Sequence, residues 1–184
     1  MLKIILKCIS VFVVVAIAVL YSACPKRIAG GYEVKNGKVI YNEGMKGLGT
    51  TNSFEVKGAD AETFDAINRD YGKDGKNAYL RGNTIPDSDG ACFEIIEKPF
   101  AKDKNHVYYS NEIISKRPQS FKFLFKLKSN SGGSETIFST DGEKIFDGRS
   151  PFLPELVDVE SFERIGKTKF LRDKNRVYLY GREI

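Results

Sequence analysis

Hydrophobic and polar residues alternate most regularly between residues 121 and 128. Phenylalanine or leucine occupies every second position of this segment, and most of the positions between are lysine. A period of two places successive side chains on opposite faces of a β-strand. The pattern predicts a half-buried strand with Phe121, Phe123, Phe125 and Leu127 on one face and Lys122, Lys126 and Lys128 on the other. The alternative interpretation is an amphipathic surface for anionic lipid, which is less favoured because one wet face is ordinary for antiparallel strands.

A short phrase recurs along the chain. Asp103-Lys104-Asn105-His106-Val107-Tyr108 returns from Asp173 to Tyr178, and looser copies begin at Asp74 and Asp141. Asp, Asn and Gly favour chain reversals, whereas Val and Tyr favour strands, so each copy predicts a β-hairpin. We expect structural roles for the turn residues Asp74, Asp103, Asn105, Asp141, Asp173 and Asn175. We expect the aromatic residues that close the phrases to form the core, rather than a row of exposed rings for a glycan: Tyr79, Tyr108, Phe146 and Tyr178.

A second phrase precedes three of these hairpins and predicts a further strand, or a short turn that leads into one. It combines a phenylalanine, a charged residue and an aliphatic residue, as in Cys92-Phe93-Glu94-Ile95-Ile96. A degenerate first hairpin has Asn36-Gly37 as its turn, and residues 129–134 predict an inserted loop. The repeat units lie near residues 32–43, 58–85, 91–114, 120–149 and 158–184.

The repeats predict a mainly β fold. Because a single hairpin is barely stable in water, neighbouring units must pair or stack. We therefore expect tandem β-hairpin repeats over residues 32–184, which form an antiparallel meander or a solenoid-like stack. One amino-terminal apolar helix is expected to precede them.

The first 24 residues have a different composition. Lys3 and Lys7 form a basic start, residues 8–24 carry no charge, and residues 11–20 are continuously apolar. This layout is typical of a bacterial export signal or a membrane anchor. Its end, Tyr21-Ser22-Ala23-Cys24, resembles the lipobox of bacterial lipoproteins, although Tyr21 stands where that family usually has leucine. The resemblance implies a lipid on Cys24, while an uncleaved anchor and cleavage with release stay open as alternatives.

All three alternatives place the remainder of the chain outside the cytoplasm, with residues 25–31 as a short tether. Only Cys92 remains in this part of the chain, so it has no partner for an intrachain disulfide, and we expect it to be small and half-buried. The chain carries 29 basic and 24 acidic side chains; without Lys3 and Lys7 the count is 27 to 24, a surplus of three. This small, scattered surplus argues against a nucleic-acid partner.

The residues offer little catalytic chemistry. His106 is the single histidine and is expected to be an exposed turn residue, so zinc sites and histidine-based triads lack ligands or partners. The acidic loops near Asp70 and Asp87 are expected to be solvated turns, because no calcium-loop spacing fits them. The sequence therefore predicts no catalytic residue, cofactor or metal.

The repeated Asp-Lys-Asn-x-Val-Tyr phrase, with its preceding Phe-containing phrase, resembles the repeat of the DKNYY family. The resemblance covers roughly residues 58–114 and 158–184. It implies a bacterial exported or membrane-attached protein of uncharacterised activity, and it supplies no catalytic residue.

These observations predict a non-enzymatic cell-envelope protein, a lipoprotein whose β-repeats present a binding or scaffolding surface. It would be held at a membrane through lipid on Cys24 or through the amino-terminal helix, facing outside the cytoplasm, with a protein or glycan as partner. One alternative is an envelope hydrolase with Asp and Glu residues brought together in space. The other is an immunity-type or inhibitor-type protein.

Overall fold

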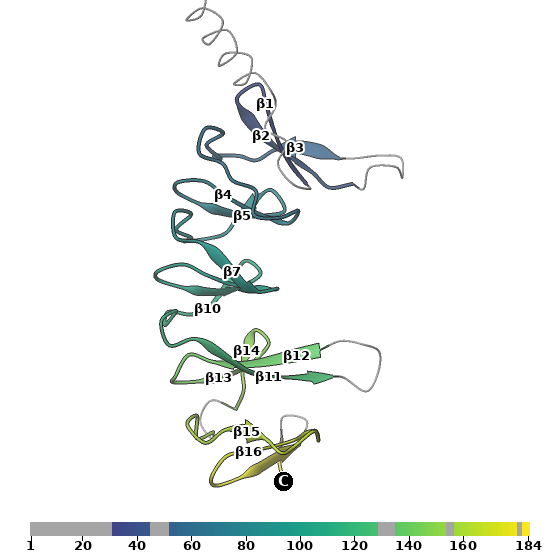
Figure 1. Cartoon of the computed structure of the whole chain (residues 1–184), viewed down its shortest axis with the longest axis vertical. Helices are drawn as coiled ribbons and strands as arrows, with labels where there is room; N and C mark the ends of the chain where they lie inside the picture. The colour runs from purple at the N-terminus through teal and green to yellow at the C-terminus, as the bar shows by residue number, and fades with distance from the viewer. Residues whose placement is uncertain (1–30, 45–51, 129–134, 154–156, 180–181) are drawn as a thin grey trace, which may run out of the picture. The chain divides into compact units, whose positions relative to one another are not determined.

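The computed structural model describes residues 31–44, 52–128, 135–153, 157–179 and 182–184. These residues form five small antiparallel sheets and no helix (Figure 1). The prediction of a mainly β, antiparallel fold is confirmed. The expected amino-terminal helix, the tether and Cys24 lie outside the described residues, among which no helix is long and apolar enough to cross a membrane.

The first two sheets have three strands each. The first contains β1 (Tyr32–Lys35), β2 (Lys38–Asn42) and β3 (Ser53–Glu55). Asn36 and Gly37 connect β1 to β2 with φ values of 51° and 71°. Two successive positive φ values define the tight turn that the Asn-Gly pair predicts. The second sheet contains β4 (Tyr71–Lys73), β5 (Ala78–Leu80) and β6 (Asn83–Thr84).

The other three sheets have four strands each, and in each sheet consecutive strands are neighbours. The third sheet contains β7 (Glu94–Glu97), β8 (Phe100–Lys102), β9 (Val107–Tyr109) and β10 (Glu112–Ser115). The fourth contains β11 (Lys122–Lys128), β12 (Glu135–Thr140), β13 (Ile145–Asp147) and β14 (Ser150–Pro151). The fifth contains β15 (Glu163–Arg164), β16 (Phe170–Arg172), β17 (Val177–Leu179) and β18 (Arg182–Glu183).

The Phe-containing phrase does become a strand in front of the hairpin. It forms β7 in the third sheet and β15 in the fifth, and in the second it contributes the single bridge between Asp65 and Lys73. A further strand follows the hairpin after a second reversal. At this reversal Arg81 and Ser110 have positive φ values, as does Gly148.

The described chain divides into two compact units, each with its own apolar interior. The first extends to Gly75 and includes Tyr79–Thr84, and the second comprises Lys76–Ala78 and the chain from Ile85 onward. In the first, buried aromatic and aliphatic residues pack together: Tyr32, Val39, Tyr41, Val56, Phe64 and Tyr79. In the second, one cluster joins the fourth and fifth sheets: Phe138, Ile145, Phe152, Phe162, Leu171 and Tyr178.

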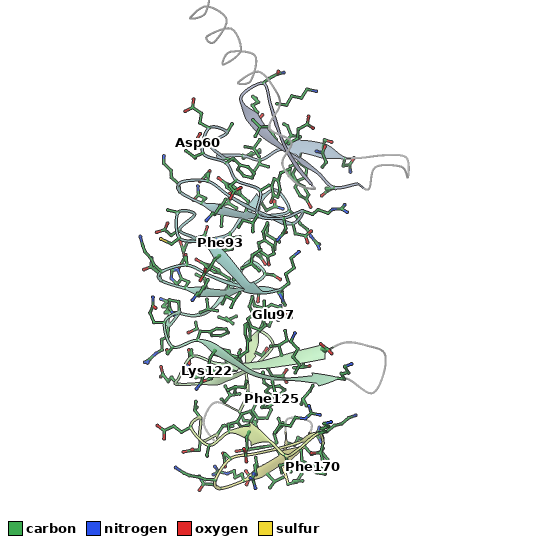
Figure 2. The ribbon with its side chains drawn as sticks, in the orientation of Figure 1. Asp60, Phe93, Glu97, Lys122, Phe125 and Phe170 are labelled. Atoms are coloured by element: carbon green, nitrogen blue, oxygen red, sulfur yellow. The ribbon has the colours of Figure 1, made fainter. Side chains whose placement is uncertain are left out.

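The predicted single apolar face of strand β11 is wrong. The register between β11 and β12 shifts between Phe123 and Phe125, because a bulge adds one residue to β11 and interrupts the alternation. Phe123 packs on Phe100 of the third sheet, with ring centroids 5.2 Å apart. Phe125 instead stacks on Phe138, at 5.0 Å, and lies 6.0 Å from Phe162 next to the fifth sheet. Figure 2 shows the side chains of this region.

Two further expectations differ from the structure. Cys92 is exposed, not half-buried, because the turn that contains it directs the neighbouring Phe93 into the interior. His106 is partly covered, with 18% of its side chain exposed, because its ring lies beside Tyr108.

Candidate functional site

The repeated acid occupies the same place in four sheets and is buried in each. Asp74, Asp103, Asp141 and Asp173 directly follow strands β4, β8, β12 and β16, and all are at most 6% exposed. Of the two acidic loops that were expected to be solvated turns, the one near Asp70 thus contains a buried acid, Asp74, whereas Asp87 in the other is exposed. A buried carboxylate is costly unless hydrogen bonds replace the water that it loses.

Asp103 shows how the turn satisfies its carboxylate. Its Oδ1 accepts hydrogen bonds from the backbone N–H groups of Asn105 and His106, both at 2.7 Å. Its Oδ2 accepts a hydrogen bond from the Tyr108 hydroxyl at 2.7 Å and another from the backbone N–H of Asp89 at 2.9 Å. The acid therefore ties its own turn to the aromatic core residue and to the turn of the preceding Phe-containing phrase.

The same arrangement recurs at Asp173. Oδ1 accepts from the N–H groups of Asn175 and Arg176, and Oδ2 accepts from the Tyr178 hydroxyl at 2.7 Å and the Asp158 N–H at 2.9 Å. At Asp74 the Tyr79 hydroxyl and the Asp60 N–H donate to Oδ2 at 2.7 and 3.0 Å. The side chains of Asn105 and Asn175 are exposed, so these residues contribute through their backbone.

Hydrogen bonds control the ionisation of the repeated acids. Burial by itself would raise the pKa of Asp173, but the donors from Tyr178 and from the backbone outweigh it and lower the pKa to about 2. The same balance lowers the pKa of Asp103. The partner tyrosine responds in the opposite direction, because burial and the adjacent carboxylate raise the pKa of Tyr178 to about 12. At neutral pH Asp173 is therefore ionised, and Tyr178 stays protonated as its hydrogen-bond donor.

The lysine of the phrase forms an ion pair with the preceding turn. Lys104 Nζ lies 2.5 Å from Asp89 Oδ2, and Lys174 Nζ lies 2.7 Å from Asp158 Oδ2. Both lysines are mostly exposed, so these pairs add little stability.

The fourth sheet departs from this scheme. Its phrase ends in Phe146, which has no hydroxyl, and Ser115 from β10 supplies one instead. The Ser115 Oγ donates to Asp141 Oδ2 at 2.6 Å, while Oδ1 accepts from the N–H groups of Glu143 and Lys144 at 3.0 and 2.9 Å. All these acids are committed to hydrogen bonds that hold the fold, and the described residues contain no cluster suited to a metal ion.

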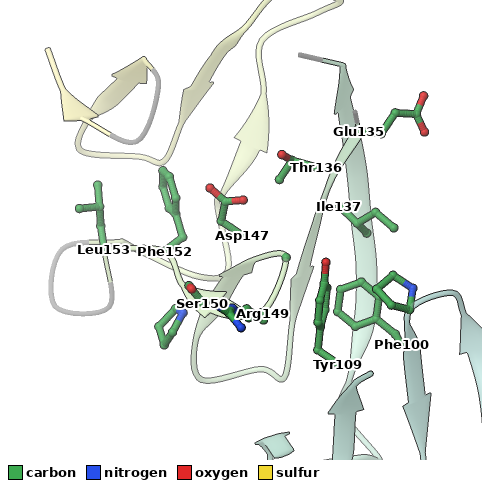
Figure 3. Close-up of a pocket in the computed structure, with 13 residues that line it drawn as sticks. Phe100, Tyr109, Glu135, Thr136, Ile137, Asp147, Arg149, Ser150, Phe152 and Leu153 are labelled. Carbon is green, nitrogen blue, oxygen red and sulfur yellow. The ribbon is translucent and has the colours of Figure 1, made fainter. Parts of the chain in front are cut away.

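A cleft lies beside the fourth sheet. Its volume is about 740 Å³, and its walls come from the turn before β8, from β9 and β12, and from the β13–β14 turn with the segment after it (Figure 3). Phe100, Tyr109 and Phe152 provide aromatic surface. The volume is within the range of small-molecule sites in proteins.

Asp147 is the distinctive polar residue of the cleft. Its carboxylate is directed into the opening, toward the same space as the hydroxyls of Thr136 and Tyr109, whereas the carboxylate of Glu135 is turned away (Figure 3). Within the described chain, no hydrogen-bond donor or cation contacts the Asp147 side chain. Although this side chain is solvent-exposed, the protein atoms around it displace enough water to raise its pKa.

Asp147 is not among the candidate residues that the sequence predicts. A signal was present in the repeat, because the equivalent position is Leu80, Tyr109 or Leu179 in the sister units. An acid that replaces an apolar repeat residue, without the donors that serve the other acids, distinguishes this position.

A protein-family model described as DKNYY family matches residues 9–112, which is more than half of the 184 residues. The chain belongs to the DKNYY family. The matched segment of this DKNYY protein includes the Asp74 and Asp103 turns, whereas the cleft residues from Glu135 onward lie beyond it. No curated protein and no solved structure matches the chain.

Proposed function

We propose that this DKNYY protein is a non-enzymatic cell-envelope protein that binds a saccharide in the cleft beside its fourth sheet. The observation that carries the proposal is the Asp147 carboxylate, which has no partner among the described residues and shares an aromatic-lined cleft with two hydroxyl groups. Binding sites of this kind combine apolar walls with a few polar groups that fix orientation. A sugar offers ring faces for the aromatic side chains and hydroxyl donors for the carboxylate.

The repeats serve this function as a frame, arranged in our proposal as a solenoid-like stack. Within the second unit, the ring of Phe100 lies 5.8 Å from that of Phe121, and Phe138 lies 6.1 Å from Phe162. These contacts join the third sheet to the segment that leads into the fourth, and the fourth sheet to the fifth. A frame fixed by such contacts holds the cleft walls in a constant geometry.

The proposal also includes the location of the protein. The basic start, the apolar segment and Cys24 support export and attachment to a membrane, by a diacylglyceryl group on Cys24 or by an uncleaved helix. Intact mass spectrometry of the protein from its native membrane tests this part. We expect a mass that begins at Cys24 and includes lipid; a mass that includes residues 1–23 identifies the uncleaved anchor, and an unmodified soluble form contradicts attachment.

Saccharide binding is tested with the full chain in neutral detergent on an array of neutral, amino and acidic oligosaccharides. We expect retention of at least one saccharide class and its loss in Asp147→Asn and Tyr109→Phe. The matched control is Glu143→Gln, an exposed acid of the same sheet that pairs with Arg117 outside the cleft. Equal binding by Asp147→Asn and the parent protein would remove the cleft from the proposal.

The residues of the cleft also support one enzymatic alternative, an envelope hydrolase in which acidic residues are brought together in space. Asp147 and Glu135 both line it, and the raised pKa of Asp147 suits a general acid. The outward direction of Glu135 favours binding over hydrolysis. Mass spectrometry of each retained saccharide after incubation distinguishes the two, since shortened products that disappear in Asp147→Asn would establish the hydrolase.

A further inference from the structure

A second concave surface, which we name the basic groove, lies between the fourth and fifth sheets. It has a volume of about 570 Å³, and among the described residues it is lined by five cationic side chains, one leucine and one acid. These residues are Lys126, Lys128, Arg164, Lys167, Lys169, Leu127 and Glu135. The formal charge on its walls is thus four positive, from five cations and one anion.

Two of the lysines have partners that an incoming anion can replace. Lys126 Nζ lies 3.2 Å from Glu97, with both side chains 45% exposed. Lys128 Nζ lies 3.8 Å from Glu135 and is 83% exposed. Exposed pairs of this kind contribute little free energy, so exchange for a ligand anion is cheap. Lys167 is exposed and forms no ion pair with any described residue.

Arg164 organises the groove and is not free to bind a ligand with its donors. Its Nε and Nη2 donate to the carbonyl oxygens of Thr168 and Lys167 at 2.6 and 2.8 Å, and its Nη1 donates to the carbonyl of Lys126 at 3.3 Å. The guanidinium therefore holds the 167–169 loop of the fifth sheet against β11 of the fourth. Arg164 is a positioning residue that also adds a fixed charge.

From this geometry we infer that the basic groove binds a phosphate-bearing polymer chain without nucleobases, with Lys126, Lys128 and Lys167 as its contacts. No aromatic side chain on which a base could stack is among the described residues that line the groove. Several lysines of one sign along a concave wall focus a field that favours successive anionic groups. Lysine ammonium groups are compact charges that suit phosphate oxygens. A concave groove fits an extended chain better than the flat surface of a bilayer. The inference is independent of saccharide binding in the cleft, which shares only Glu135 with the groove.

The test is calorimetric titration of the full chain, in neutral detergent, with short-chain inorganic polyphosphate. We expect binding whose affinity falls steeply with added salt, because counterions are released when lysines contact phosphates. The double variant Lys126→Gln/Lys167→Gln is expected to bind about tenfold more weakly, at roughly threefold for each exposed charge pair lost, and to show a shallower salt dependence. The matched control is Lys122→Gln, an exposed lysine on the same strand outside the groove.

Four results would overturn the inference. The first is no polyphosphate binding by the parent chain, and the second is an equal loss of affinity in Lys122→Gln. The third is binding to phosphatidylglycerol vesicles that Lys126→Gln/Lys167→Gln weakens while polyphosphate fails to compete, which would make the groove a membrane contact. The fourth is tighter binding of a single-stranded oligonucleotide than of polyphosphate with the same charge. Thermal melting of each variant confirms that the fold is retained.

Discussion

The third and fourth sheets both provide hydrogen-bond donors to a buried aspartate, but the hydroxyl donor comes from a different place in each. Each buries an aspartate directly after a strand, and each provides backbone N–H groups for Oδ1. In the third sheet the hydroxyl donor to Oδ2 is Tyr108, five residues along the chain. In the fourth it is the Ser115 hydroxyl, 26 residues earlier. The buried charge requires a hydroxyl, and the fold accepts that hydroxyl from either source.

The fourth sheet departs from the repeat in other respects as well. It contains Asp147 at an otherwise apolar position, and it forms one wall of both the cleft and the basic groove. The third sheet retains the full phrase, and its repeated acid serves structure alone. In our proposals the fourth sheet contributes to both binding surfaces, in addition to the buried acid that it shares with the third sheet.

Low pH is expected to have the largest effect on the stability of both sheets. Hydrogen bonds lower the pKa of Asp103, Asp141 and Asp173 below the ordinary 3.8, to about 2 for Asp173. An acid with a lowered folded-state pKa contributes stability above its unfolded pKa and loses it as pH falls through the folded value. Denaturant titrations should therefore show constant stability from neutral pH to about pH 5 and a steep loss between about pH 4 and pH 2. A flat profile through this window would contradict the assigned hydrogen bonds.

The next largest effect is expected for Asp103→Ala in the third sheet. The change leaves the Tyr108 hydroxyl and three backbone N–H groups without their acceptor. Buried donors without a partner cost about 1–3 kcal/mol each, so we expect a loss of about 4 kcal/mol in the free energy of unfolding. Glu94→Ala, which removes an exposed acid on β7, serves as the control and should be near neutral. If the two variants lost similar free energies of unfolding, the hydrogen bonds of the Asp103 turn would not be the cause of the loss.

Tyr108→Phe is expected to cost less, about 2 kcal/mol, which is typical of a buried hydrogen bond to a charged group. The variant gives the third sheet the phenylalanine that the fourth sheet already has, but without a serine to compensate. Chemical denaturation measures the change. A neutral result would mean that backbone donors alone satisfy Asp103, and that the hydroxyl of the fourth sheet has no energetic role either.

The smallest effect is expected for Lys174→Gln in the fifth sheet. Its ion pair with Asp158 is exposed, so the melting temperature should change little at low salt and not at all at high salt. A large loss that persists at high salt would show that the lysine of the phrase, and not only its aspartate, holds the repeat together.

Much of this arrangement could be predicted from the repeated phrase, because turn and strand preferences are local properties of the chain. Asp103 and Tyr108 were identified as turn and core residues for that reason. The hydrogen bond between them could not be predicted, since it depends on how the second strand of the hairpin places Tyr108 beside Asp103. The hydrogen bond from the Ser115 hydroxyl could be predicted even less, because Ser115 contacts Asp141 from another sheet.

The two other discrepancies have equally specific causes. Alternation along β11 predicted one apolar face, but a single extra residue between Phe123 and Phe125 reverses the pattern, and composition does not reveal such a bulge. Asp147 was missed because the dipeptide Asp-Gly reads as a turn signal. Alignment of the repeats one position beyond the aromatic residue would have identified it as an acid among apolar residues.

The most direct test of the central claim is a double-mutant cycle of Ser115→Ala and Phe146→Tyr, measured by chemical denaturation. Ser115→Ala alone should cost about 2 kcal/mol, since Asp141 loses the donor to Oδ2 and the Arg117 N–H loses its acceptor. Phe146→Tyr alone should give little gain, because the Ser115 hydroxyl already provides a donor to Asp141 Oδ2. In the double variant the tyrosine should restore at least about 1 kcal/mol, with a clear coupling energy. Strictly additive losses would contradict the claim that either hydroxyl satisfies the buried acid.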